Sequence, residues 1–169
     1  PGVITSLLMN NVTINKGEAL FLPAGNIHAY LHGLGFEVMA ASDNVIRGGL
    51  TPKHIDVDEL LKIVNFSELP VPFVRTHEIG RGAKSYPVTV EDFTVTSYDL
   101  ADESRYQFRI TNEAIMVCAS GSVSVVCGSQ KRDLVAGHCV YTNNVTDIYE
   151  LSGNGQVFIV SVSAPSISI

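Results

Sequence analysis

The stretch that decides the fold lies near the start of the chain and reads Gly17-Glu18-Ala19-Leu20-Phe21-Leu22-Pro23-Ala24-Gly25-Asn26-Ile27-His28. Gly17 makes the turn into a short apolar strand. Pro23 and Gly25 then form a tight reversal, because proline lacks the amide that a ladder needs and glycine tolerates unusual backbone angles. His28 opens the returning strand. Its imidazole is predicted to face the interior of a barrel, where a neutral ring nitrogen can bind a divalent metal.

Short β-branched stretches recur between turn residues along the whole chain, which is typical of an all-β sandwich or barrel. One helix is predicted near Asp56 to Val64, with Asp56 as its N-cap and acids in its first turn. The pattern divides the chain into a first segment at 1–66, a linker at 67–84 and a second β segment at 85–169. Strands are predicted at 12–14, 19–22, 36–39, 93–98, 114–118, 122–126, 147–151 and 157–162.

Composition excludes several classes of protein. The 169 residues are 46% hydrophobic and only 17% charged, which argues against disorder. No apolar run reaches the roughly 18–20 residues of a membrane span, and a net charge of −6 without a Lys/Arg block argues against general nucleic-acid or membrane binding. Three cysteines without a CxxC pair indicate buried, reduced thiols and a cytoplasmic protein. The first residue is Pro1 rather than Met, which suggests a piece of a longer protein.

The opening stretch resembles the second half of the cupin signature, in which Gly is followed by five residues, Pro-x-Gly, two residues and His. The wider segment, with His28-Ala29-Tyr30 and Arg47-Gly48-Gly49-Leu50-Thr51-Pro52-Lys53, closely resembles type I mannose-6-phosphate isomerases over roughly Gly2 to Val64. Residues from about Pro70 onward resemble the C-terminal β domain of that family in pattern only. The resemblance implies an all-β, cupin-like jelly roll, in which part of a catalytic cupin unit at 1–66 precedes a degenerate, metal-free cupin-like domain at 85–169.

The family resemblance also implies a site. Family members hold zinc with a Gln, two His and a Glu, and interconvert mannose 6-phosphate and fructose 6-phosphate through an enediol. His28 falls on the last metal-ligand position, and the other three ligands belong to a segment that precedes Pro1. Arg47 falls on the catalytic arginine position. The remaining positions that line the family's active site are occupied here by Tyr30, Glu37, Asp43 and Lys53.

These residue types make chemical sense independently of the resemblance. Enolisation needs a base for a weakly acidic carbon proton and positive charge beside the developing enediolate. Either Glu37 or Asp43 can be the base, Arg47 can stabilise the oxyanion, Lys53 can contact a phosphate, and Tyr30 can hydrogen-bond the sugar. The structural alternative is solvated charge at Lys53 and an ion pair between Asp43 and Arg47.

Two functions follow as hypotheses. The first is the C-terminal portion of a zinc-dependent isomerase, inactive as an isolated chain because one histidine cannot hold four-coordinate zinc. Its expected partners are the sugar phosphates, the missing N-terminal region and a second copy, since an interrupted barrel exposes unpaired backbone. The second is a non-enzymatic β-sandwich module that binds a sugar phosphate or packs against a partner domain.

Overall fold

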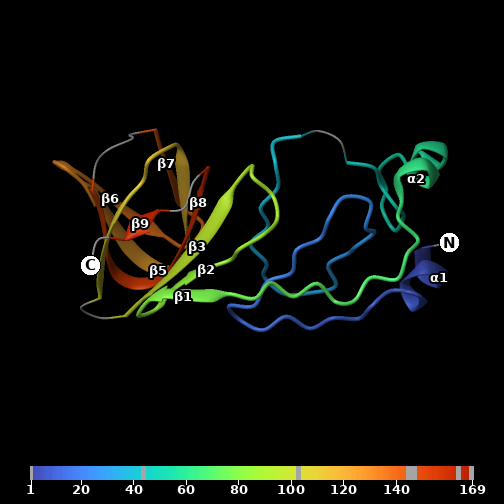
Figure 1. Ribbon diagram of the computed structural model, residues 1–169, viewed down its shortest axis with the longest axis horizontal. Helices are drawn as coiled ribbons and strands as arrows, with labels where there is room; N and C mark the ends of the chain where they lie inside the picture. The colour runs from blue at the N-terminus through green and yellow to red at the C-terminus, as the bar shows by residue number, and fades with distance from the viewer. Residues whose placement is uncertain (1, 43–44, 102–103, 144–147, 163–164, 168–169) are drawn as a thin grey trace. The chain divides into compact units, whose positions relative to one another are not determined.

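The structure is a computed structural model that describes residues 2–42, 45–101, 104–143, 148–162 and 165–167. The chain divides into two compact units, residues 1–74 and 75–169. Figure 1 shows the helices of the first unit and the strands of the second. Neither helix of the described chain is long and apolar enough to cross a bilayer.

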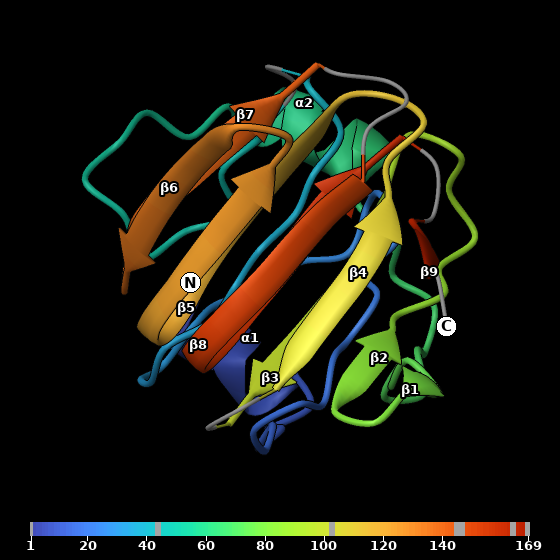
Figure 2. The same ribbon diagram turned by 90° about the vertical axis from the view of Figure 1, so that its left-hand side faces the viewer.

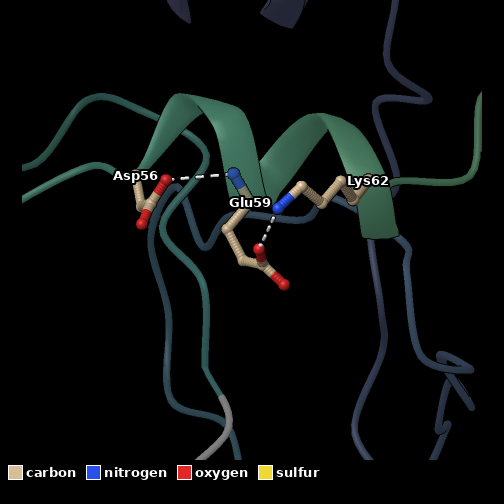
Figure 3. A network of polar contacts seen from close by, with 3 residues as sticks. All are labelled: Asp56, Glu59 and Lys62. Carbon is tan, nitrogen blue, oxygen red and sulfur yellow. Dashed lines mark hydrogen bonds and ion pairs between the residues drawn. The ribbon is translucent and has the colours of Figure 1, made fainter.

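The first unit contains two short helices, α1 at Gly2–Leu7 and α2 at Val57–Ile63. The sequence predicts α2 correctly, including its cap, since Asp56 Oδ1 accepts a hydrogen bond of 3.0 Å from the Glu59 amide. Lys62 Nζ lies 2.9 Å from Glu59 Oε2 on the same helix (Figure 3). The sequence does not predict α1, because its residues carry no capping signal.

The strands predicted for the first unit do not form. In its described residues the only ladder contact is an isolated bridge between Leu20 and Phe73. Two backbone hydrogen bonds flank that bridge, from Phe21 N to the Pro72 oxygen at 3.0 Å and from Val74 N to the Ala19 oxygen at 2.8 Å. A strand needs a continuous ladder, and the stretches at 12–14, 19–22 and 36–39 have the composition of strands but form no such ladder in the described residues. No described residue of this unit is buried.

The second unit is an antiparallel β structure. The sequence predicts this class correctly but places the first strands too late, because the second half of the predicted linker forms a hairpin that belongs to the sheet. Ala83 in that hairpin is fully buried. The strands are β1 His77–Gly80, β2 Ala83–Ser85, β3 Thr94–Leu100, β4 Arg105–Arg109, β5 Ala114–Cys127, β6 Gln130–Val135, β7 Cys139–Thr142, β8 Ile148–Ser161 and β9 Ser166–Ile167.

Two long strands organise this unit. β5 and β8 pair antiparallel along nearly their whole length and lie side by side in Figure 2. At one end they pair with β7 and β3, which we call the β3 half of the sheet, and at the other end with β6 and β4, which we call the β4 half. β2 and β1 extend the β3 half, whereas β9 extends the β4 half.

The sequence predicts four separate strands where the structure has β5 and β8, and this prediction is wrong. Gly121 and Gly155 fall between the predicted strands, but they lie inside the continuous ladder. A Cβ on Gly121 would lie 2.1 Å from the Asn154 oxygen, and one on Gly155 would lie 2.1 Å from the Ser120 oxygen. Glycine therefore permits a close backbone approach where the two strands change partners, with a register shift between Cys118 and Ser120.

The core of the second unit fills the interior of this bent sheet. Aromatic rings occupy its centre, where Tyr98 stacks on Phe108 with centroids 5.4 Å apart, and Phe108 stacks on Tyr149 at 6.0 Å. All three side chains are buried, as are Met116 and Leu151. The three cysteines are free, but the prediction that all are buried is wrong, because only Cys118 is buried and Cys139 is exposed.

Candidate functional site

His28 follows a turn that the end of α2 holds in place. The Asn65 amide donates to the Gly25 oxygen at 2.8 Å, and the Asn26 side-chain amide donates to the Pro23 oxygen at 2.9 Å. Gly25 has φ +83°, and a Cβ there would lie 2.8 Å from the Ile63 oxygen. Glycine is therefore required both by the backbone angle and by the packing against α2, which fixes where the segment carrying His28 begins.

The His28 ring is oriented by a neighbouring carbonyl. Nδ1 lies 3.1 Å from the Asn26 oxygen, so in the tautomer protonated at Nδ1 the ring donates to that oxygen and Nε2 keeps its lone pair. In that tautomer, the carbonyl on the first residue after the turn leaves Nε2 available to an electrophile. Sequence reasoning missed Asn26, because its contribution is a backbone oxygen, which leaves no signal in residue type.

Tyr30 and Glu37 lie together beside His28. The rings of His28 and Tyr30 meet edge to face, with centroids 6.1 Å apart. Desolvation raises the pKa of the Tyr30 hydroxyl above its ordinary value, and a hydrogen bond to the Glu37 carboxylate and the charge of that group raise it further. Tyr30 nevertheless remains 72% exposed, so this group of three side chains is open to solvent in the described chain.

The backbone that follows Arg47 passes close to the segment that carries His28. A Cβ on Gly48 would lie 3.4 Å from Ile27 Cγ2, so the segment after Arg47 passes directly beside the one that carries His28. Gly49 has φ +140°, an angle that supports the predicted tight path of the backbone here. The Arg47 side chain is half-buried. The structure therefore brings the segments of His28, Tyr30, Glu37 and Arg47 to one region.

The other two candidate residues, Lys53 and Asp43, have no described contact that links them to this region. Lys53 is exposed, and its backbone amide donates to Thr51 Oγ1 at 3.2 Å. No contact described in the structure joins the Lys53 side chain to His28 or Arg47. Asp43 lies outside the described residues, so the choice between Glu37 and Asp43 as the base stays a prediction.

The described residues do not make a zinc site by themselves. Zinc takes four ligands in structural centres and at least three from protein in catalytic ones. No group of three or more His, Cys, Asp or Glu side chains comes together among the described residues. His28 offers one suitable nitrogen, and further donors would have to come from elsewhere.

Stacked aromatic rings pack the centre of the second unit. An open cleft of about 620 Å³ is lined by residues that include Arg81, Arg105 and Tyr106. Polar groups of this cleft already have partners within the protein. Arg105 pairs with Glu150 at 3.1 Å, and the Tyr106 hydroxyl donates to the Arg81 and Asp99 carbonyl oxygens.

The bent antiparallel sheet, together with a Pro-x-Gly turn that presents a histidine, defines a cupin-like all-β protein. No protein-family model matches the chain. Mannose-6-phosphate isomerase from Escherichia coli is 38% identical over 157 residues, which are 92% of this chain and 40% of that protein. The enzyme from Aspergillus fumigatus is 30% identical over 90% of this chain and 37% of its own length. A solved mutant of phosphomannose isomerase from Salmonella typhimurium matches 72% of this chain and 32% of its own, with a TM-score of 0.62 and 28% identity.

By sequence and by fold, the chain belongs to the mannose-6-phosphate isomerase family. It spans about 40% of the length of the bacterial relatives it matches.

The solved structures of the Salmonella enzyme include separate alanine mutants of a histidine, a glutamate and an arginine. In that enzyme the glutamate follows the histidine by nine residues and the arginine follows it by nineteen. Glu37 and Arg47 follow His28 by the same intervals. The mutated histidine is preceded in that enzyme by more residues than the 169 that make up the present chain.

Proposed function

We propose that this chain is the C-terminal portion of a zinc-dependent aldose–ketose isomerase that interconverts mannose 6-phosphate and fructose 6-phosphate. The observation that carries the proposal is the gathering of the His28, Tyr30, Glu37 and Arg47 segments in one region. The identical intervals among three of these residue types in the Salmonella enzyme support the same assignment.

The proposed reaction moves one proton between adjacent carbons. A carboxylate, Glu37 or Asp43, takes the proton from C2 of the aldose and returns it to C1, while the O2 hydroxyl proton moves to O1. The intermediate is an enediol, and Arg47 stabilises the negative charge that develops on its oxygens. Tyr30 hydrogen-bonds the sugar, and Lys53 contacts the phosphate.

Zinc belongs, in this proposal, to the complete protein. His28 supplies one nitrogen, and ligands from a preceding region supply the rest. The isolated chain is therefore inactive. The absence of any fully buried residue from the described part of the first unit supports this view, because a unit without a core cannot hold an active site rigidly.

The test compares this chain with the product of the complete reading frame in an assay that follows fructose 6-phosphate formation. We expect turnover only in the longer protein, a loss of about 100-fold or more in Arg47→Ala, and loss of zinc on dialysis in His28→Ala. Arg132→Ala and His77→Ala, which change exposed residues of the second unit, are the matched controls. Stoichiometric zinc and turnover in the isolated chain, both abolished by His28→Ala, would overturn the proposal.

One observation favours a second role for the second unit. Its interior is filled by aromatic side chains, and its described residues gather no metal ligands. We propose that this unit is a packing module within the parent protein. If the chain is instead a non-enzymatic binding module, Arg47→Ala should retain affinity for the sugar phosphate better than an enzyme retains turnover.

A further inference from the structure

The two outer faces of the second unit differ sharply in chemistry. On the β3 half, buried residues such as Met116 and Ile159 point inward, so their neighbours along β5 and β8 point outward. Those outward neighbours are apolar. We call the set the outer apolar face, and it consists of Val95, Ile115, Val117, Tyr141, Phe158 and Val160.

The residues of this face are aligned across four strands. Ile115 on β5 pairs with Tyr141 on β7 and with Val160 on β8, and Val160 pairs in turn with Val95 on β3. An adjacent row joins Val117 with Phe158. Cross-strand neighbours at such registers lie within reach of one another, so the six side chains form one continuous surface.

The outer side of the β4 half is mostly polar. Ser124 pairs with Ser152 and with Asp133, and Ser152 pairs with Arg105. In the next row Glu150 accepts hydrogen bonds from Arg105 and Gln107. Side chains of this kind are ordinary for a solvated sheet face.

Part of the outer apolar face is already covered from within the unit. The Tyr86 ring lies 6.2 Å from that of Phe158, and its hydroxyl is 3.1 Å from Ser97 Oγ. This cover ends at β8. Ile115 on β5 remains 46% exposed and Tyr141 on β7 remains 61% exposed, so the part of the face on β5 and β7 is open.

We infer that the outer apolar face is an internal docking surface, and that its occupant is the region of the parent polypeptide that precedes this chain. The chain spans 40% of the Escherichia coli relative, which leaves most of that protein to supply the occupant. The mutated histidine of the Salmonella enzyme, which lies further along its chain than 169 residues, places that remainder before the position of His28. The inference rests on the proposed parent protein but not on its catalysis.

A second copy of the chain is a poorer occupant, because the face is small. A stable dimer buries about 800 Å² per partner with roughly 20–30 residues on each side, whereas this face has six. A covalently connected segment needs less area, since the linkage holds it at an effective concentration near the millimolar range. The outer side of the β4 half is mostly polar, and its exposed apolar residues Val135 and Ile148 lie opposite Ser122 and Arg109.

Cys139 provides a natural probe of the face. Cys139 is exposed on β7, where it lies opposite Val117 and on the same side of the sheet as Tyr141. The test measures the alkylation rate of Cys139 by mass spectrometry of its peptide, in this chain and in the product of the complete reading frame. Ser122→Cys, at an exposed position on the outer side of the β4 half, is the matched control.

We expect Cys139 to react about tenfold more slowly in the longer protein, because a docked surface opens only a small fraction of the time. The cysteine of Ser122→Cys should react at rates within about twofold of each other in the two proteins. In the longer protein, Tyr141→Ser and Ile115→Thr should each restore fast alkylation of Cys139. Isomerase activity is recorded separately, so loss of catalysis and failure of docking are distinguishable.

Three results would overturn the inference. Equal alkylation rates of Cys139 in the two proteins would show that the face meets solvent in both. A rate that falls as the concentration of the isolated chain rises would place a second copy on the face. A reading frame that starts at this chain would remove the occupant altogether.

Discussion

Tyr98 offers a sharp test of how the second unit is stabilised. Its side chain is fully buried between Tyr106 and Phe108, and its ring contacts both. Among the described residues, the Tyr98 hydroxyl and Thr96 Oγ1 are the buried side-chain atoms that have no hydrogen-bond partner of ordinary geometry, although Thr96 is close enough to lower the pKa of Tyr98 against the larger effect of burial. An unpaired buried hydroxyl costs about 1–3 kcal/mol. Tyr98→Phe removes this hydroxyl and keeps the ring, so we expect it to stabilise the unit at neutral pH by about 1–2 kcal/mol.

The pH dependence gives the same substitution a second readout. Burial raises the pKa of Tyr98 to about 12, whereas an unfolded tyrosine ionises near 10. Between these values the folded state keeps a proton that the unfolded state has lost, so stability is intact below about pH 10 and falls as the pH rises toward about 12. The loss is about 1.4 kcal/mol at about pH 11 and approaches about 2.7 kcal/mol above about pH 12. The Tyr98→Phe variant has no hydroxyl to ionise at this position, so its free energy of unfolding should lack this alkaline loss.

The assay is urea unfolding of the second unit, followed at neutral pH and at several alkaline values. With a slope of about 1–2 kcal/mol/M, the variant's midpoint should rise by roughly 1 M at neutral pH. Tyr149→Phe is the matched control with the opposite sign, because the Tyr149 hydroxyl has a partner in Thr142 Oγ1. A destabilised Tyr98→Phe at neutral pH would refute the reasoning, as would a variant whose stability falls with pH as steeply as that of the original chain.

Three further outcomes are expected. Gly121→Ala should destabilise the second unit by more than 3 kcal/mol, because its Cβ would meet the Asn154 oxygen at 2.1 Å. Gly128→Ala shares a positive φ but meets open space, so it should cost only about 1 kcal/mol; equal losses in the two thermal melts would show that the close approach is unimportant. Amide exchange should be fast throughout residues 2–42 and 45–74 and slow in β5 and β8, since the buried residues in the described part of the chain all lie in the second unit; protected amides in the first unit would contradict this. The isolated chain should sediment partly as a dimer at high concentration through unpaired backbone of the first unit, and a clean monomer would count against that association.

Local signals in the sequence predict the parts of the structure that depend on neighbouring residues. The Asp56 cap specifies α2, and the alternation in 93–98 specifies β3. The turn that precedes His28 is equally local, because Pro23, Gly25 and Asn26 hold it with nearby contacts and the end of α2. The candidate site is predicted largely by this local motif and its family resemblance.

Nonlocal contacts explain what the sequence does not predict. Gly121 and Gly155 look like turn residues, but their role depends on two backbones that meet from distant parts of the chain. The strand-like stretches of the first unit form no continuous ladder in the described residues, because a ladder requires partner strands, which no local pattern supplies. The orphaned hydroxyls of Thr96 and Tyr98 are also invisible in the sequence, since only packing decides whether a buried polar atom finds a partner.

Chemistry and burial are divided between the two units, and this division has a mechanistic consequence. The candidate residues lie in the unit that has no fully buried side chain among its described residues, whereas the described residues of the unit with a core gather no group of metal ligands. In the proposed mechanism, Arg47 can stabilise an enediolate only if its position is fixed, because a displacement of about 1 Å can cost about 100-fold in rate. The proposal therefore predicts that activity requires polypeptide that completes the first unit, and a measured order of recovery would test it. Addition of the preceding region should protect the amides around His28 before, or together with, the return of turnover; turnover that returns without that protection would show that the site needs no such support.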